Sequence, residues 1–210
     1  RRGSLNVKVT VHGTQGHVAY PHRADNPLHR LVRALDALTS APIDAGSDWF
    51  EPTTLQLTSV DVGNTATNVI PASATAMFNM RFNERHSGAS LIAWIRATFA
   101  QYCDRFDLEP SISGESFLTQ PGEHVDKLRR AIAAHTGMDP KLDTGGGTSD
   151  ARFIANYCPV AEFGLVGATM HQVDERVPVG ELRQLADIYE AVLADFLPTL
   201  TEIIALKREE

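Results

Sequence analysis

The sequence predicts two parts: a ferredoxin-like βαββαβ domain over residues 1–114, and an α/β segment over residues 115–210. Alternating strand patterns, two amphipathic helical patterns, and the order strand, helix, strand, strand, helix, strand all favour the first part. The second part has three helical patterns but only two short apolar runs. Two short strands cannot cover three helices as an independent sheet. We therefore expect one complete small domain and one portion of a larger α/β domain.

Four strands are expected in the first part. Residues 5–11 alternate apolar and polar without a break, and residues 74–82 alternate again. Residues 53–60 predict another strand, and residues 108–113 predict a weaker fourth one. A four-stranded sheet with both helices on one face leaves the other face and an edge uncovered, so we expect two copies of the chain to pair.

Two helices are expected between these strands. Asn26 is a good N-cap residue and Pro27 suits the first helical position, so the first helix begins there. Ser87 would cap the second helix. The apolar residues that recur at helical spacing are Leu28, Leu31, Val32, Leu35 and Leu38 in the first helix, and Leu91, Ile92, Ile95 and Phe99 in the second.

The second part alternates helical patterns with two candidate strands. Residues 122–135 predict a helix closed by Gly137, and residues 141–144 and 160–163 predict short buried strands. A final helix is expected from Val179. The apolar residues expected on its buried face are Leu182, Leu185, Ile188, Val192 and Phe196.

Between the two candidate strands lies the glycine-rich segment 145–150, Gly-Gly-Gly-Thr-Ser-Asp. Glycines let the backbone approach a ligand closely. One of Thr148, Ser149 and Asp150 would cap a helix at residues 151–155, and free amides at such a helix start favour an anion. The segment belongs to the longer stretch 143–175, in which strand, glycine loop, helix, strand and His171 follow one another, an order typical of α/β enzymes that place their chemistry at the carboxyl ends of strands.

Composition excludes several function classes. The net charge of −7 and the lack of a basic stripe argue against a nucleic-acid partner. No apolar run approaches the roughly 20 residues needed to span a membrane. Cys103 and Cys158 are too few for a disulfide framework, so reduced thiols and a cytoplasmic location are expected. The start at Arg1, without a methionine and almost directly before a strand, suggests an interior cut.

Six short segments together carry a resemblance to a known family. They are residues 1–4 (RRGS), 15–22 (QGHVAYPH), 67–71 (TNVIP), 78–82 (FNMRF), 145–150 (GGGTSD) and 169–171 (TMH). In this order they resemble the succinyl-diaminopimelate desuccinylases, dinuclear zinc amidohydrolases of the M20 metallopeptidase family. The likeness covers almost the whole chain, which no single short motif could provide.

The resemblance implies a division of labour between the two parts. Residues 1–114 would be the lid domain, through which two copies form a homodimer, and residues 115–210 the C-terminal portion of the zinc-hydrolase catalytic domain. The family binds two zinc ions, with cobalt as a possible substitute, and this chain would supply one ligand, His171. The family's other metal ligands and its general base lie before the lid, so we expect this chain alone to be inactive.

The resemblance also implies roles for individual residues. His17 would reach into the active site of the partner subunit and stabilise the oxyanion, a catalytic role, and Glu162 or Glu175 would orient the metal ligand His171. Arg81 would clamp a carboxylate of a small dicarboxylate amide substrate. The substrate-binding candidates are Arg1, Ser4, Tyr20, Asn68, Arg81, Gly147, Thr148 and Ser149, of which Tyr20 and Asn68 would come from the partner's lid.

Two departures from the family pattern leave alternatives open. Thr67 stands where the family often has a second Asn, and Gly167 stands where it often has the first residue of Asn-x-Thr-x-His. A different M20 deacylase, of the N-acetylornithine deacetylase or aminoacylase type, is therefore an alternative. An alternative of another class is a non-catalytic dimerisation or binding module that forms a stable dimer and binds no zinc.

Overall fold

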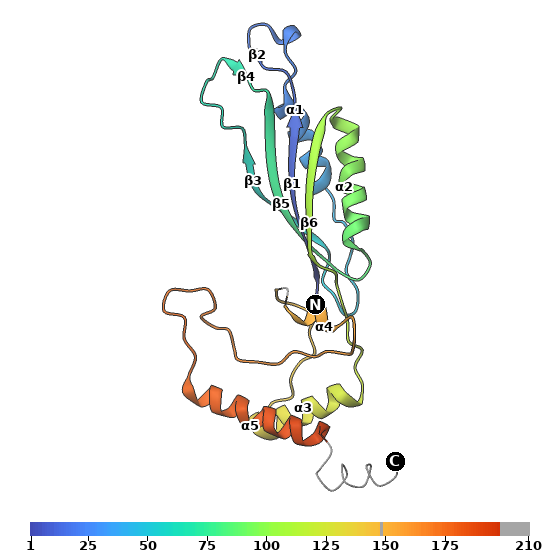
Figure 1. The fold of residues 1–210 in the computed structure, drawn as a ribbon, viewed down its shortest axis with the longest axis vertical. Helices are drawn as coiled ribbons and strands as arrows, with labels where there is room; N and C mark the ends of the chain where they lie inside the picture. The colour runs from blue at the N-terminus through green and yellow to red at the C-terminus, as the bar shows by residue number, and fades with distance from the viewer. Residues whose placement is uncertain (148, 198–210) are drawn as a thin grey trace. The chain divides into compact units, whose positions relative to one another are not determined.

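The computed structural model describes residues 1–147 and 149–197 and divides the chain into two compact units (Figure 1). The first, here called the sheet unit, comprises Arg1–Leu118 and Asp143–Asn156. The second, here called the helix-pair unit, comprises Thr119–Leu142 and Tyr157–Glu210. The boundary expected after residue 114, between the lid domain and the catalytic portion, stays a prediction.

Each of the four strands expected in the first part is present and forms one antiparallel sheet. The strands are β1 (Gly3–His12), β3 (Thr54–Asp61), β5 (Ser73–Phe82) and β6 (Phe106–Gly114), in the order β3-β5-β1-β6. β6 extends beyond the weak pattern that predicted it. β1 and β5 are central, while β3 and β6 form the two edges.

Two helices cover one face of this sheet. α1 (Pro27–Thr39) and α2 (Gly88–Tyr102) pack against each other, and each packs against strands of the sheet. The predicted caps are confirmed. The Asn26 side chain accepts a hydrogen bond from the amide of Leu28 at 3.0 Å, and Ser87 forms a capping box at the start of α2.

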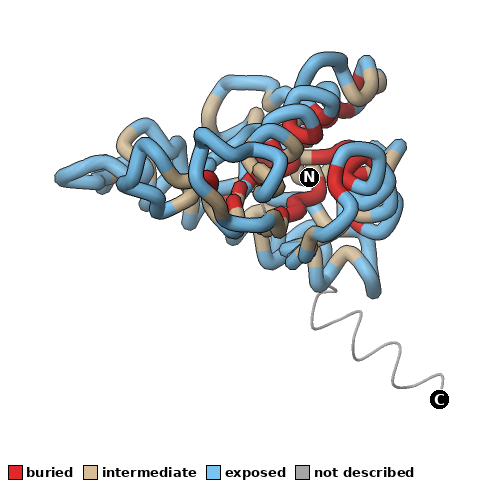
Figure 2. The backbone as a smooth tube through the Cα atoms, turned by 90° about the horizontal axis from the view of Figure 1, so that it is seen from above, coloured by how far each residue is buried: buried red, intermediate tan, exposed pale blue. Residues whose placement is uncertain are grey.

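Buried and exposed residues alternate along the central strands, so the sheet has one apolar face and one polar face. Odd-numbered residues of β1 and even-numbered residues of β5 are buried under the helices. Figure 2 shows buried stretches of backbone in red, surrounded by exposed ones in pale blue. The intervening side chains lie on the polar face. The buried core consists of Leu5, Val7, Val9, Val11, Leu31, Ala34, Leu35, Leu38, Ala74, Ala76, Phe78, Met80, Phe82, Leu91, Ile95, Phe99 and Cys103.

Three small elements, which the sequence did not predict, lie beyond the end of the sheet that is remote from the chain's N-terminus (Figure 1). β2 (Gly16–His17) pairs with β4 (Val69–Ile70) in an antiparallel two-residue ladder. A single 3-10 turn, η1 (Pro21–Arg23), follows β2. These elements give shape to a segment that would otherwise be an open loop.

The helix-pair unit is built on α3 (Glu123–Thr136) and α5 (Val179–Phe196). The helices are antiparallel, because Lys127 near the start of α3 donates to the carbonyl of Asp195 at 3.3 Å, while Gln184 near the start of α5 donates to the carbonyl of His135 at 2.8 Å. The predicted stop of α3 is confirmed, with a left-handed glycine after its last turn.

Two expectations for the second part are wrong. Among the described residues, the runs 141–144 and 160–163 form no strand. A short apolar run becomes a strand only where a neighbouring strand satisfies its backbone groups, and the described residues bring none to either run. The expected buried face of α5 is also only partly buried: Ile188 is buried, Leu185 and Val192 are half-buried, and Leu182 and Phe196 are exposed.

Within the described residues, no helix combines the length and apolar character required to cross a membrane.

Candidate functional site

The predicted site residues of the sheet unit fall into two groups. The base group lies at the start of β1 and in the glycine-rich segment, and consists of Arg1, Ser4, Arg81, Gly147 and Ser149. The tip group lies at the β2–β4 ladder beyond the other end of β1, and consists of His17, Tyr20 and Asn68. His171 belongs to the helix-pair unit, and Thr148 lies outside the described residues.

Arg81 and Ser4 are neighbours across the two central strands. They are paired in the antiparallel register of β1 and β5, and Thr54 is the partner of Arg81 on the β3 side. Arg81 alternates with the buried Met80 and Phe82, so its side chain belongs to the polar face, as predicted. A guanidinium thus lies at the base of the sheet, next to a buried serine.

Arg1 joins the glycine-rich segment to the same end of the sheet. Its main chain exchanges two hydrogen bonds with Phe117, at 2.8 and 3.0 Å, and its Nη1 donates to the carbonyl of Gly145 at 2.6 Å. Gly146 has a φ of +82°, and a Cβ added there would lie 2.5 Å from Arg1 Nη1. The left-handed conformation favours glycine at this position, and a side chain there would also displace the Arg1 guanidinium from its place.

Ser149 carries a buried hydroxyl whose Oγ has no hydrogen-bond partner within the described part of the chain. Its carbonyl accepts a hydrogen bond from Arg152 Nη1 at 2.7 Å, which orders the turn. A buried hydroxyl without a partner is uncommon and is consistent with a group that binds there from outside the chain.

The helix predicted after the glycine-rich segment is only one turn long, α4 (Ala151–Ile154). The expectation of a side-chain cap is wrong for the two described candidates. Asp150 occupies the N-cap position without a capping hydrogen bond, and the Ser149 hydroxyl makes none either. Thr148, the third candidate, lies outside the described residues. An anion at this place would depend on the backbone of the glycines and on Ser149 rather than on a helix start.

His17 is held in one orientation by its own turn. The amide of Ala19 donates to Nδ1 of His17 at 3.1 Å, and the rings of His17 and Tyr20 lie 5.9 Å apart. Because Nδ1 accepts this bond, the proton of a neutral His17 is on Nε2. The exposed imidazole therefore presents an N–H donor, which is the group that oxyanion stabilisation requires.

Tyr20 and Asn68 accompany His17. The ring of Tyr20 is exposed, and the Arg23 guanidinium lies 5.4 Å from its centroid. The carbonyl of Asn68 accepts a hydrogen bond from the amide of Val18 at 3.1 Å, which extends the β2–β4 ladder by one residue. The tip group is thus a small exposed cluster of polar and aromatic side chains.

The two groups are too far apart to share one small ligand within a single chain. Ser4 and His12 are eight residues apart on β1, which at ~3.3 Å per residue is roughly 26 Å. The tip group lies beyond His12. A substrate that contacts both groups would therefore have to receive them from different copies of the chain.

Sequence reasoning missed the residues that fix the two ends of the segment 14–25, which carries His17 and Tyr20. Thr14 and Asp25 exchange two backbone hydrogen bonds there, and Arg30 on α1 contacts the Asp25 carboxylate and donates to the carbonyl of His12. A Cβ on Gly13 would lie 2.2 Å from the Asp25 carbonyl. The glycine was the only available signal, because the pairing of Arg30 with residues on another element cannot be read from spacing.

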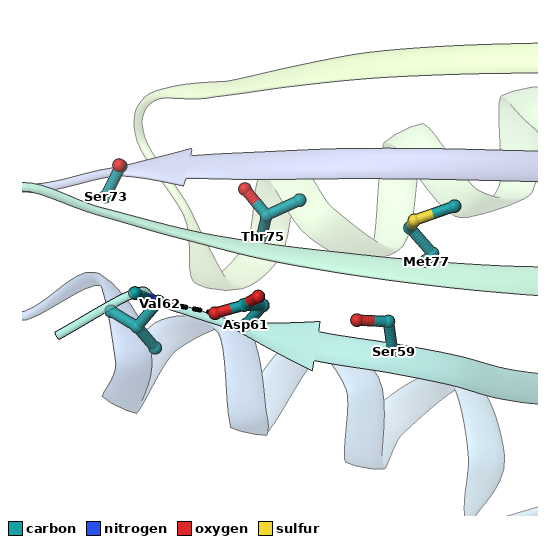
Figure 3. A pocket seen from close by; sticks show the side chains of 7 residues that line it. Ser59, Asp61, Val62, Ser73, Thr75 and Met77 are labelled. Atoms are coloured by element: carbon teal, nitrogen blue, oxygen red, sulfur yellow. Dashed lines mark hydrogen bonds between the residues drawn. The ribbon is translucent and has the colours of Figure 1, made fainter. Parts of the chain in front are cut away.

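Two surface pockets lie elsewhere in the sheet unit. One lies between β3 and β5, where Ser59, Asp61, Thr75 and Met77 face one another on the polar side of the sheet (Figure 3). The other lies between the end of α1 and the start of α2. Neither pocket is lined by a predicted site residue, and both are open hollows, so we do not assign the site to them.

His171 lies on an exposed turn of the helix-pair unit. Its φ of +61° is unusual for a residue other than glycine. Its backbone amide donates to a carboxylate oxygen of Glu175 at 3.4 Å, so Glu175 contacts the main chain of His171. Unusual backbone conformations are enriched at functional sites, which keeps His171 a candidate.

The described residues do not form a metal site by themselves. Within the part of the chain that the structure describes, no group of three or more His, Cys, Asp or Glu side chains is placed to hold an ion. A single imidazole is fewer ligands than a metal centre requires, so His171 can serve only as one member of a larger set.

Comparisons with known proteins agree on one family. The model of the peptidase dimerisation domain matches residues 1–107. A curated protein from Acidiphilium cryptum, named succinyl-diaminopimelate desuccinylase, is 63% identical over 193 residues, covering 92% of this chain and 52% of its own length. A protein of the same name from Gluconobacter oxydans is 59% identical over 196 residues, covering 93% of this chain and 51% of its own. The chain thus spans about half the length of the curated relatives it matches.

A solved structure is similar at the level of the fold. It is an M20 family metallo-carboxypeptidase, Sso-CP2 from Sulfolobus solfataricus, which is 13% identical with a TM-score of 0.74. The match covers 91% of this chain and 58% of that chain. At this identity the likeness supports a shared fold and carries no information on substrate.

Proposed function

The chain belongs to the M20 peptidase dimerisation domain family, and on that premise we propose that it forms part of a succinyl-diaminopimelate desuccinylase. The complete enzyme would hydrolyse N-succinyl-LL-2,6-diaminopimelate to succinate and LL-2,6-diaminopimelate. We assign the sheet unit, whose strand order is β3-β5-β1-β6, to the ferredoxin-like lid of that enzyme. In a homodimer, the two lids would bring the base group of one copy close to the tip group of the other.

One observation carries the proposal: the described site candidates of the sheet unit gather at two ends of one sheet instead of scattering over it. The base group offers cationic and hydrogen-bonding groups suited to substrate carboxylates, namely the guanidinium of Arg81 and the buried hydroxyl of Ser149. The tip group offers the Nε2–H of His17. A substrate with several carboxylates around one amide needs both kinds of group.

The base group would bind and orient the substrate. Arg81 would form a paired contact with one carboxylate, and the backbone of the glycines after Thr144 would approach another closely. Arg1 would support this segment through its bond to the Gly145 carbonyl. These contacts hold the substrate amide in one orientation, which is a large part of the advantage of an enzyme.

The tip group would act on the reacting amide. As its carbonyl oxygen gains negative charge, the Nε2–H of His17 would donate a hydrogen bond to it, and Tyr20 and Asn68 would line the same side. Because roughly 26 Å of β1 separates the groups, the tip residues would come from the partner's lid. We propose zinc as the metal of the complete enzyme, with His171 as one of its ligands.

The direct test is a hybrid enzyme. The N-terminal half of the Acidiphilium cryptum relative, joined ahead of this chain, is expected to release succinate from N-succinyl-LL-2,6-diaminopimelate, while the 210-residue chain alone does not. Faster hydrolysis of N-acetylornithine or of N-acyl amino acids would indicate another M20 deacylase. A stable dimer with no activity in any hybrid would indicate a non-catalytic dimerisation module.

Mixed dimers of the hybrid test the sharing of sites. His17→Ala is expected to lower kcat by about 10²–10³-fold, the effect of losing one oxyanion donor. Arg81→Ala is expected to raise KM. Mixing the two impaired variants, assayed at a substrate concentration well below the raised KM, should restore activity, because one site of the heterodimer then has both residues intact. No recovery, with heterodimers shown to form, would place both residues in one protomer's site and contradict the proposal.

A further inference from the structure

The loop between α1 and β3 is closed around one buried carboxylate, that of Asp44. The Asp44 carboxylate accepts hydrogen bonds from the amide of Gly46 at 2.7 Å and from the amide of Thr53 at 3.2 and 3.3 Å. It also accepts from Asn83 Nδ2 at 2.7 Å and contacts His86 Nε2 at 3.0 Å. One side chain thus joins the beginning and end of the loop to the turn that follows β5.

This carboxylate is anionic throughout the ordinary pH range. Burial alone would raise the pKa of Asp44, but hydrogen bonds from Thr53, Gly46 and Asn83 outweigh that effect and lower it to about 2. The Asp44 side chain is 8% exposed and Asn83 is fully buried. Asn83 also donates to the carbonyl of Glu51 at 3.3 Å, so it reaches the far side of the same loop.

The outer part of the loop, residues 47–50, holds the backbone carbonyl of Trp49 in a fixed position. The side chain of Phe50 is buried, and its carbonyl accepts a hydrogen bond from the amide of Ser47 at 2.8 Å. The neighbouring carbonyl of Trp49 accepts a hydrogen bond from the hydroxyl of Thr144 at 2.5 Å. Thr144 is itself buried, so this bond is shielded from water.

Thr144 leads directly into the glycine-rich segment of the base group. The carbonyl of the next residue, Gly145, receives the Arg1 guanidinium at 2.6 Å. A second contact connects the same loop with the start of the chain: Arg2 Nη1 lies 3.4 Å from a carboxylate oxygen of Glu51. The loop closed by Asp44 is therefore in contact with both segments that carry base-group residues.

We propose that Asp44 and Asn83 are positioning residues, which fix the 44–53 loop so that its Trp49 carbonyl holds Thr144 and, through it, the Gly145–Gly147 backbone for a substrate carboxylate. The last clause rests on the proposed function, whereas the positioning itself does not. Neither residue would touch substrate. If Asp44 and Asn83 only stabilised the loop, their loss would change the stability of the sheet unit and not the order of the Gly145–Gly147 backbone. An experiment can therefore distinguish positioning from stabilisation.

The test measures amide hydrogen exchange of residues 143–147 in the 210-residue chain. Asp44→Ala and Thr144→Val are each expected to speed this exchange about tenfold, the change that loss of one buried hydrogen bond produces. Asp36→Asn is the matched control, because Asp36 is an exposed carboxylate on α1 that bonds Ser40, and it should leave the exchange unchanged.

Thr144→Val separates positioning from stability. It leaves the Asp44 bonds intact, so the urea midpoint followed by tryptophan fluorescence should fall much less than in Asp44→Ala, while exchange at residues 143–147 rises by a similar factor in both variants. This variant also keeps the inference falsifiable if Asp44→Ala fails to fold. Unchanged exchange in Thr144→Val, or an Asp44→Ala variant that unfolds earlier but exchanges there at the wild-type rate, would overturn the inference.

A titration with sodium succinate distinguishes this inference from the proposed function. Succinate is expected to slow exchange at residues 143–147 in the wild type, and Asp44→Ala should require about tenfold more of it. If the wild type does not respond although the variants exchange faster, the proposed function fails and the positioning stands. If succinate protects all variants equally, the positioning inference fails and the carboxylate site stands.

Discussion

The sheet unit and the helix-pair unit contain equally clear helical patterns, but they bury them very differently. In the sheet unit, α1 and α2 lie on a four-stranded sheet, and their apolar residues are largely buried. In the helix-pair unit, α5 has 18 residues and buries only Ile188, while Leu193 is 56% exposed. An amphipathic pattern therefore predicts a helix reliably, but the burial of its face depends on a partner surface that the pattern does not contain.

Core truncation should show the largest difference between the units. Phe78→Ala removes a buried ring from the centre of the sheet and is expected to cost about 3–5 kcal/mol. Leu193→Ala, on the exposed part of α5, should cost within about 0.5 kcal/mol. The free energy of unfolding of Phe78→Ala can be measured by urea unfolding followed by tryptophan fluorescence. The two tryptophans of the chain, Trp49 and Trp94, both lie in the sheet unit and report on its unfolding. Similar costs for both variants would contradict the comparison.

Acid should weaken the sheet unit through Asp44. The folded-state pKa of about 2 lies below the ordinary value of 3.8, so the charged form stabilises the fold by about 2 kcal/mol above pH ~4. This contribution is lost as the pH falls through about 2. The urea midpoint should therefore fall more steeply between pH 4 and pH 2 in the wild type than in Asp44→Asn. Parallel curves for the two proteins would show that Asp44 does not titrate in this way.

The glycine that ends α3 tests the local geometry of the helix-pair unit. Gly137 has a φ of +72°, and Gly137→Ala should destabilise α3 by about 1–2 kcal/mol, because an L side chain is strained there. Gly122→Ala, at the other end of the helix, is the matched control: its backbone is extended and a Cβ meets no atom within 4 Å. Thermal unfolding followed by far-UV circular dichroism should separate the two variants.

The smallest expected effect is the loss of a cap in the sheet unit. Asn26→Ala removes the side chain that accepts from the amide of Leu28 and should cost about 1 kcal/mol. Asn26→Asp keeps an acceptor and should be nearly neutral. A cost above 3 kcal/mol, read from the urea midpoint by tryptophan fluorescence, would mean that Asn26 stabilises more than the helix start.

Much of the sheet unit was predictable because its signals are local. Alternation identified the strands, and the caps of α1 and α2 and the stop of α3 were visible as single residues. The failures concern relations between distant residues. The runs 141–144 and 160–163 have strand composition, yet pairing depends on a neighbour that the described residues do not provide. Likewise, no spacing connects Asp44 with Asn83 or Arg30 with Asp25.

The candidate site was proposed from motifs rather than from patterns, and the roles of its residues stay predictions. At one end of the sheet, Ser4 and Arg81 are neighbours through the register of β1 and β5. At the other end, the pairing of β2 with β4 brings His17 close to Asn68, and Tyr20 lies in the turn that follows β2. The tautomer of His17 could not be predicted, because it depends on the amide of Ala19 folding back to the ring. The orphan hydroxyl of Ser149 was equally invisible.

The central strand β1 is hydrogen-bonded on both sides along its length, which makes it a stiff arm between the base group and the tip group. A rigid arm converts a small rotation at one end into a large displacement at the other. A slight turn of the whole sheet about its foot near Ser4 would thus swing the imidazole of His17 through a long arc without breaking a single strand bond. The core under the helices would stay unchanged during such a turn.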